Sequence, residues 1–265
     1  MSIASSFILD IKNVIDRRKS KARFFEYFFI NGKSISEKMN KKTPHILIEG
    51  SVQYQLGELK GNIIHYDFQK ILIYLEAKGK LLFGKSFKIH KEDEAILYKL
   101  CIYFIRDFEA CKKLEIDPNK GILLSGPVGC GKTSLMKLLP HIVPHQKTYK
   151  VIPARNIAFE FNNKGFSTID EYGNNNYYCF DDLGVETTGR HFGKDCNVMG
   201  EILLSRYDLF ARTCHPERSR GVKTHATTNL NAQELEEGYG NRVRSRMRQL
   251  FNLIAFDKES VDKRV

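Results

Sequence analysis

The residues with the most specific chemistry in this chain form one short run. They are Gly126-Pro127-Val128-Gly129-Cys130-Gly131-Lys132-Thr133. This run matches the pattern G-x-x-x-x-G-K-[ST], in which glycines let the backbone curl until several N–H groups face phosphate oxygens. The Lys132 ammonium is then expected to reach the β- and γ-phosphates of a nucleotide, and the Thr133 hydroxyl is expected to hold Mg²⁺. Together with Ser134, the run predicts a site for ATP and Mg²⁺.

The segments on either side of this run predict a strand before it and a helix after it. Residues 121–125 are apolar and follow the turn-forming Asp117-Pro118-Asn119, which indicates a buried strand. Residues 133–139 have helical composition and stop at Pro140. A strand, a glycine-rich loop and a helix in this order aim the N-terminus of the helix at a bound anion.

A second acidic site follows the aromatic stretch 177–180, which predicts a buried strand that ends in Asp181-Asp182. A carboxylate at the carboxyl end of such a strand can hold Mg²⁺ through water, and its neighbour can orient the attacking water. We expect Asp181 to serve the metal and Asp182 to serve the water. A paired acidic turn without a ligand is the alternative interpretation.

Two further polar features follow in the chain. Asn229 comes directly after a strand predicted at 223–228, and ligands of open α/β sheets bind at the carboxyl ends of strands. It is therefore expected to reach the γ-phosphate or the water, although asparagine also favours turns. A helix predicted at 240–250 carries four arginines, and its charge alone also suits a DNA-facing or solvated surface. These arginines are Arg242, Arg244, Arg246 and Arg248.

In combination, the glycine-rich loop, Asp181-Asp182, Asn229 and the arginine helix resemble the Walker A, Walker B, sensor 1 and arginine-finger motifs of AAA+ ATPases. The resemblance covers about residues 91–256 and points to the helicase-loader and transposition-helper (DnaC/IstB-like) group. It implies that Arg246, with Arg242 as the alternative, reaches the γ-phosphate bound by a neighbouring subunit. Active sites would then form only in an oligomer.

Two features depart from the pattern of that family. Most AAA+ proteins carry glutamate where this chain has Asp182, and the shorter side chain bears on the rate of hydrolysis. Glu186 lies close by in sequence and is the substitute candidate. Only residues 257–265 follow the last predicted strand, at 251–256, so we expect the C-terminal helical lid and its sensor 2 arginine to be missing.

The alternation of predicted strands and helices indicates an α/β fold, a P-loop NTPase sheet of parallel strands with helices on both faces. We expect this ATPase domain to span residues 91–265 and to begin with one amphipathic helix at 92–115. A small α or α+β domain that binds DNA or a partner protein is expected at residues 1–90. Its predicted elements are a helix at 67–78 that stops at Gly79 and a strand at 87–89.

The charge of the chain favours an anionic partner, for which nucleic acid is the usual case. The net charge is +11 and the isoelectric point is about 9.3. Within the stretch 17–28, basic residues precede aromatic ones, the combination with which proteins contact phosphates and stack on bases. A small aromatic core with a solvated basic edge is the alternative interpretation of this stretch.

Several classes of function remain in competition at this point. The cysteines lack metal-ligand spacing, and neither a secretory signal nor a membrane-spanning run is visible, so we expect a cytoplasmic protein. The leading hypothesis is an ATP-hydrolysing replication accessory, an ATP-dependent homo-oligomer that binds single-stranded DNA and delivers a replicative helicase. The nearest alternative is a transposition helper that acts with a transposase. A P-loop small-molecule kinase and a weakly hydrolysing nucleotide-gated scaffold are the others.

Overall fold

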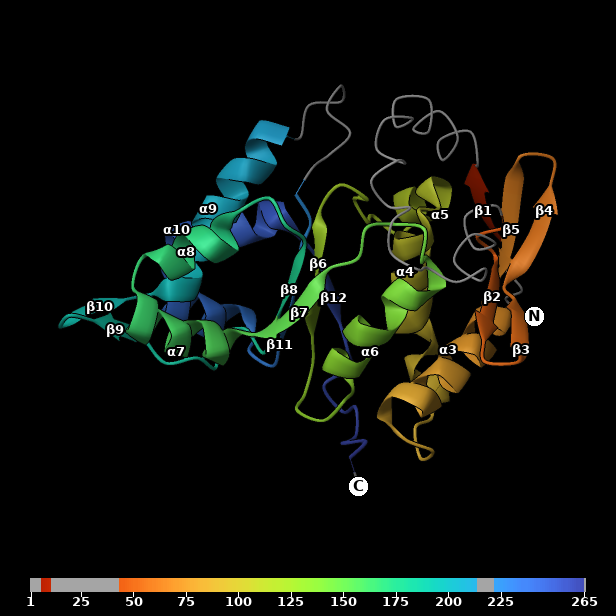
Figure 1. Ribbon diagram of the computed structural model, residues 1–265, viewed down its shortest axis with the longest axis horizontal. Coiled ribbons are helices and arrows are strands. Elements are labelled where there is room, and N and C mark those ends of the chain that lie inside the picture. Colours follow the sequence, from red (N-terminus) through yellow and green to blue (C-terminus); the bar gives the residue numbers. More distant parts are fainter. Residues whose placement is uncertain (1–5, 11–42, 214–221, 265) are drawn as a thin grey trace, which may run out of the picture. The chain divides into compact units, whose positions relative to one another are not determined.

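A computed structural model of the chain describes residues 6–10, 43–213 and 222–264 (Figure 1). The basic and aromatic stretch 17–28 therefore lies outside the described residues. Contacts between residues group the chain into two units, one of residues 1–115 with 138–147 and the other of residues 116–137 with 148–265. This grouping by contacts differs from the domain boundary near residue 90 that the sequence predicts. That boundary is inferred from sequence patterns and stays a prediction.

Antiparallel strands make up much of the first unit, and the sequence patterns predict none of them. Three form a sheet in the order β1-β5-β4, and two form a separate hairpin. In β5 the buried side chains are Ile64 and Tyr66, the alternation of a half-buried strand. Strands and helices together give this unit an α+β composition. The strands are β1 (Ser6–Asp10), β2 (Ile46–Glu49), β3 (Val52–Gln55), β4 (Gly57–Lys60) and β5 (Ile63–Asp67).

The helix predicted at 67–78 is present as α3 (Phe68–Phe83) but runs further than the sequence indicates. Its start is as expected, because the Asp67 carboxylate accepts hydrogen bonds from the backbone N–H groups of the first turn. The predicted stop at Gly79 is wrong, since the helix ends at Gly84. Gly79 serves packing instead: a Cβ there would lie 2.1 Å from the Phe87 ring. The strand predicted at 87–89 is absent, since these residues pair with no strand, and Phe87 instead packs on α3.

The single helix predicted at 92–115 is divided in two in the structure. A 3₁₀ turn, η3 (Lys91–Asp93), leads into α4 (Glu94–Ile105), and α5 (Phe108–Lys113) follows. Arg106 between the helices has φ 60°, which ends α4, and the Asp107 carboxylate accepts a hydrogen bond from Ala110 N–H at 2.9 Å to start α5. The apolar spacing continues across this break, so periodicity alone does not reveal it.

The second unit is built on a five-stranded sheet in the order β12-β6-β11-β8-β7, in which every pair of neighbours is parallel. This confirms the parallel sheet predicted from the alternation of elements. The strand β11 lies between β6 and β8 although it follows both in the chain, so the carboxyl ends of these three meet at one edge. The strands are β6 (Gly121–Ser125), β7 (Lys150–Pro153), β8 (Tyr178–Asp181), β11 (Thr224–Thr228) and β12 (Phe251–Ala255).

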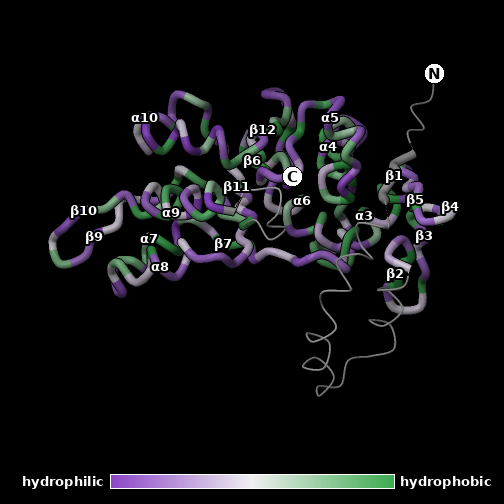
Figure 2. The backbone as a smooth tube through the Cα atoms, turned by 90° about the horizontal axis from the view of Figure 1, so that it is seen from above, coloured by the Kyte–Doolittle hydropathy of each residue, from purple (hydrophilic) through white to green (hydrophobic). Residues whose placement is uncertain are grey.

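Helices cover both faces of this sheet. On one face Leu123, Phe180 and Ala226 pack against α7, α9 and α10 in a continuous core. On the other face Tyr149 donates a hydrogen bond to the carbonyl of Met136 in α6. Most residues of α10 are hydrophilic, purple in Figure 2, and only one side of it is buried. The helices are α6 (Lys132–Leu138), α7 (Ala154–Lys164), α8 (Ser167–Gly173), α9 (Val198–Thr213) and α10 (Ala232–Leu250).

Three details of the second unit matter for the site. A short hairpin, β9 (Gly189–His191) with β10 (Lys194–Cys196), follows β8 and is not predicted by the sequence patterns. The helix α10 begins with a capping box formed by Asn231 and Glu234, and it kinks at Gly240, where φ is 78°. No helix follows β12 within the described residues, and no described helix is long and apolar enough to cross a membrane.

His225 joins the sheet ladder through its side chain. Its Nδ1 accepts a hydrogen bond from Ile122 N–H of β6 at 3.1 Å, and its ring lies 4.6 Å from the ring of Tyr149. Burial, followed by the nearby cations Lys223 and Arg206, lowers the pKa of His225 to about 3. The imidazole must therefore be neutral in the folded chain, because a protonated Nδ1 cannot accept this bond.

This histidine predicts a specific dependence of stability on pH. As pH falls from 6.5 toward 3, the unfolded chain binds a proton at His225 that the folded chain does not bind. The free energy of unfolding should therefore fall with pH, by up to about 1.4 kcal/mol per unit for this group. Urea unfolding between about pH 7.5 and 5.5 should give a shallower decline for His225→Gln than for the wild type. His90→Gln in the first unit is the matched control. An unchanged slope in His225→Gln would contradict the assignment.

Candidate functional site

The glycine-rich run forms a loop between the end of β6 and the start of α6, as the sequence predicts. Gly129 and Gly131 have φ of 82° and 99°, in the left-handed region that favours glycine. The Lys132 side chain is 5% exposed, and its Nζ donates to the carbonyls of Gly126 and Pro127, each at 2.8 Å. The ammonium is thus held within the loop by the carbonyls of the loop's own first residues.

A buried carboxylate lies beside the loop at the end of β8. Asp181 is 7% exposed, and its oxygens lie 2.8 and 3.0 Å from the Thr133 hydroxyl at the start of α6. The Thr227 hydroxyl of β11 donates to the same carboxylate at 2.7 Å and accepts a hydrogen bond from Asp182 N–H at 2.9 Å. The structure therefore brings together the two residues that the sequence assigns to the metal, and it adds Thr227, which the motifs do not identify.

The residues predicted to handle water lie at the same edge of the sheet. Asp182 is exposed with φ 54°, and Asn229 is exposed directly after β11. No side-chain hydrogen bond within the described part of the chain engages either residue. The substitute candidate Glu186 is engaged instead, because its carboxylate accepts hydrogen bonds from Gly184 N–H at 2.8 Å and from the Tyr239 hydroxyl of α10. Of the two carboxylates, Asp182 is the one whose side chain is available.

The arginines of α10 make their described contacts outside the loop. The Arg246 guanidinium stacks over the Tyr207 ring at 4.5 Å and donates to the Tyr207 hydroxyl at 3.3 Å. Arg242 is exposed, whereas Arg244 is 8% exposed, with a pKa lowered by burial and by the neighbouring Arg248. Among the described residues, no hydrogen bond, ion pair or ring contact connects these arginines to residues 126–133.

The residues after β12 return to the loop, which the sequence does not indicate. Lys263 donates from its backbone N–H to the Gly129 carbonyl at 3.1 Å and from Nζ to the Cys130 carbonyl at 3.0 Å. The Asp262 carboxylate lies against Gly129, where an added Cβ would be 2.1 Å from Asp262 Cγ. The segment after β12 is rich in charged residues, and this composition does not predict a contact with the loop.

A glycine-rich phosphate loop after β6, an acid at the end of β8 and the strand β11 between them now define the architecture. The fold is that of a P-loop NTPase. In such a P-loop fold the ligand site is the edge at which the loop and the strand ends meet. In this chain that edge carries Lys132, Thr133, Asp181, Asp182 and Asn229.

Comparison with known proteins gives likenesses of fold. No family model matches the chain. A crystal structure of the DnaC helicase loader is 17% identical, with a TM-score of 0.45, and the alignment covers 64% of this chain and 92% of that one. AMPPCP-bound DnaA from Aquifex aeolicus is 19% identical, with a TM-score of 0.43 and 64% of this chain covered. A DNA replication initiation factor is 18% identical, with a TM-score of 0.41 and 65% covered. The alignments span 48% of each of the last two proteins.

The contact of the C-terminal segment with the P-loop can be tested through Cys130, which is 1% exposed. Lys263→Ala removes the hydrogen bond to the Cys130 carbonyl and loosens the cover over the loop. We expect thiol-reactive reagents to modify Cys130 several-fold faster in this variant, as followed by peptide mass spectrometry. Lys258→Ala, a cation of the same segment without a described bond to the loop, should keep the wild-type rate. Equal rates in all three proteins would show that the segment does not cover the loop in solution.

Proposed function

We propose that this chain binds and hydrolyses ATP with Mg²⁺ and acts as a DNA-replication accessory of the helicase-loader type. The observation that carries the proposal is the contact between Thr133 and Asp181 beside the phosphate loop. It places a hydroxyl at the start of α6 and a carboxylate at the end of β8 within 3.0 Å of each other. Mg²⁺ prefers oxygen ligands of these kinds, so the residues present fit the ion that accompanies ATP.

The binding roles follow from the positions of the loop residues. The backbone N–H groups of residues 128–134 would hold the phosphates at the N-terminus of α6. Lys132 would exchange the loop carbonyls that it contacts now for β- and γ-phosphate oxygens. Thr133 and Asp181 would hold Mg²⁺, which when bound neutralises charge on those oxygens.

The hydrolytic role falls to Asp182. Its carboxylate is exposed at the sheet edge, while its backbone is fixed by the bond from its N–H to Thr227. Asp182 would orient a water whose oxygen bonds to the γ-phosphorus as the bond to the β-phosphate oxygen breaks, which yields ADP and phosphate. Asn229, at the end of the adjacent strand β11, would contact the γ-phosphate or this water.

The arginine that completes the site would come from a second copy of the chain. Arg246, with Arg242 as the alternative, has no described contact to the phosphate loop of its own chain. Tyr207 keeps the Arg246 side chain in one orientation, from which a neighbouring subunit can receive it. Hydrolysis would then depend on an ATP-dependent homo-oligomer.

DNA and a replicative helicase are the proposed partners, and single-stranded DNA is the proposed nucleic acid. Support comes from the net charge of +11 and from the resemblance of the motifs to helicase loaders. A transposase is the alternative protein partner, since transposition helpers carry the same motifs. A small-molecule kinase and a weakly hydrolysing scaffold are the functions that experiment must separate from this one.

Substitution of the site residues tests the chemistry. Asp182→Asn should bind ATP as the wild type does and lose about 100-fold or more in turnover, because the water is no longer oriented. Lys132→Ala should weaken nucleotide binding itself. Asp208→Asn, an exposed aspartate of α9, is the control. Binding is followed with a fluorescent ATP analogue and turnover by phosphate release. Full turnover in Asp182→Asn would remove this residue from the mechanism.

The same turnover assay separates the classes of function. Stimulation of wild-type hydrolysis by single-stranded DNA is expected for a loader or a transposition helper, and co-purification with a helicase or with a transposase then distinguishes these two. Phosphorylation of a small acceptor would indicate the kinase. ATP binding with negligible turnover in every condition would indicate the scaffold.

The shared active site is tested by mixing two inactive variants. Arg246→Ala should bind ATP nearly normally and hydrolyse it slowly, because it lacks the arginine for its neighbour. Adding Lys132→Ala protein should restore part of the activity, since one variant supplies the arginine and the other an intact loop. The specific activity of the wild type should also rise with protein concentration. Absence of rescue at every mixing ratio, with activity independent of concentration, would contradict a site shared between subunits.

A further inference from the structure

The tip of the hairpin β9–β10 carries an aromatic residue in an unfavourable environment. Phe192 is 93% exposed, and it has φ 47° in a two-residue turn with Gly193 at φ 77°. Turns with positive φ at both positions favour asparagine, aspartate or glycine, and a bulky residue in this conformation is an outlier. The chain therefore places a large apolar ring where both hydration and backbone sterics oppose it. Strain of this kind gathers at functional sites.

The hairpin that presents this ring is firmly supported within the second unit. Asn162 of α7 accepts a hydrogen bond from Arg190 N–H at 2.7 Å on its side chain, and its carbonyl lies 3.2 Å from His191 Nδ1. The His191 ring stands 6.1 Å from the buried Phe161 ring and 4.3 Å from the Phe192 ring. These contacts fix the base of the hairpin on α7, and the tip with Phe192 extends beyond them into solvent. Figure 1 shows the hairpin extending beyond α7 at the left of the view.

Cations and a second ring continue this surface. Arg190 is paired with Asp195 at 3.4 Å, and because both side chains are about 70% exposed this pair is readily exchanged for a phosphate. On α7, Arg155 and Phe159 are both exposed and stand four residues apart, on the helical face that also carries Asn162. The carboxylate of Glu160 on the same helix is occupied by Lys164 and Tyr172.

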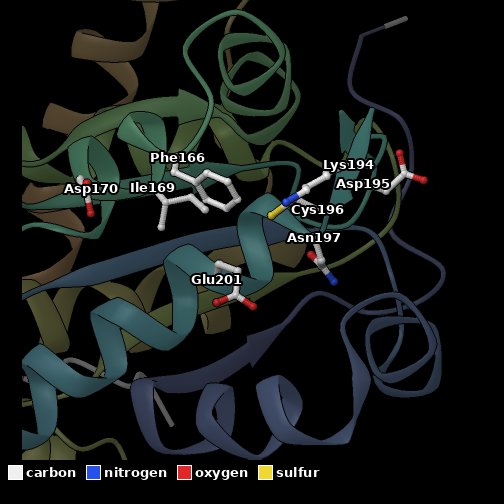
Figure 3. Close-up of a pocket in the computed structure, with 8 residues that line it drawn as sticks. All are labelled: Phe166, Ile169, Asp170, Lys194, Asp195, Cys196, Asn197 and Glu201. Atoms are coloured by element: carbon white, nitrogen blue, oxygen red, sulfur yellow. The ribbon is translucent and has the colours of Figure 1, made fainter. Parts of the chain in front are cut away.

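The other side of the hairpin has the opposite character. Figure 3 shows the hollow between α8, β10 and the start of α9, whose lining residues include the acids Asp170 and Glu201 together with Lys194. With two acids against one cation, this side has a net negative charge that repels a phosphate chain. An anionic strand is therefore directed to the tip and to the Arg190 side.

We propose that the β9–β10 hairpin is a contact for single-stranded DNA, in which Phe192 stacks on a base and Arg190 binds an adjacent phosphate. An exposed ring beside a cation has the chemistry of single-strand binding, where stacking tolerates any base. A protein-binding hot spot would instead be surrounded by contacts that exclude water, whereas the neighbours of Phe192 in the turn are His191 and Gly193. The proposal rests on the DNA-binding part of the proposed function and assigns it a site.

The strained turn allows a decisive test with the full-length protein. Phe192→Asn supplies the residue type that the turn favours, so the variant should unfold at the same temperature as the wild type or a higher one. Its affinity for a fluorescently labelled oligothymidylate, measured by anisotropy with a non-hydrolysable ATP analogue, should fall at least about fivefold, because one base stack is lost. Phe192→Trp should retain the affinity. Phe166→Asn, which removes an exposed ring beside the acidic hollow, is the matched control and should bind as the wild type does.

A salt series with Arg190→Gln tests the phosphate contact. Loss of one phosphate neutralised on a single strand should reduce the slope of log affinity against log salt by about 0.7. Wild-type affinity in Phe192→Asn would overturn the hairpin site while leaving DNA binding in place. Loss of helicase binding in Phe192→Asn with unchanged DNA affinity would overturn it in favour of a protein-docking surface. Absence of DNA binding by the wild type itself would remove the DNA part of the proposed function, and with it this inference.

Discussion

A single buried carboxylate determines the geometry of the candidate site. Asp181 is 7% exposed, and an ionised carboxylate at that depth requires hydrogen-bond donors. Two hydroxyls supply them, Thr133 from the helix after the phosphate loop and Thr227 from β11. These three residues are far apart in the chain and meet only because β11 lies between β6 and β8. The strand order of the sheet and the chemistry of the site are therefore one constraint: a different order would leave the charge without partners.

The helix that carries the arginines is connected to this centre through Glu186. The Tyr239 hydroxyl of α10 donates to Glu186, which also accepts from Gly184 N–H two residues after Asp182. Gly240 kinks α10 directly after this anchor. The helical turns that carry Arg242 and Arg246 therefore run in a different direction from the first part of α10. Glu186 thus links the segment after Asp182, which would orient water, to α10, which would serve a neighbouring subunit. Because its carboxylate makes this link, it is not available for other contacts.

Features set by local sequence could be predicted, and features set by distant partners could not. The glycines, Lys132 and Thr133 form a loop whose shape follows from their own backbone preferences, and the apolar runs before it and before Asp181 predict β6 and β8. No sequence pattern around Thr227 indicates its role, because Thr227 contributes a hydrogen bond to Asp181 only through the register of β11 beside β8. The same holds for the contact of Lys263 with Gly129. In the first unit, Gly79 has the appearance of a helix stop and instead accommodates the Phe87 ring, a reason that sequence spacing does not contain.

The grouping of residues 138–147 with the first unit has a consequence for the order of folding. The chain passes from the first unit to the second, returns after α6 and leaves again at residue 148, so the first unit is not one continuous stretch. During synthesis it cannot be completed before residue 147 emerges, and by then the only second-unit segment made is 116–137, with β6, the phosphate loop and α6. The neighbours of β6 in the sheet, β11 and β12, are made last. The phosphate loop is therefore synthesised before the strands that complete its sheet, and it can adopt its place in the sheet only after β11 and β12 have been made.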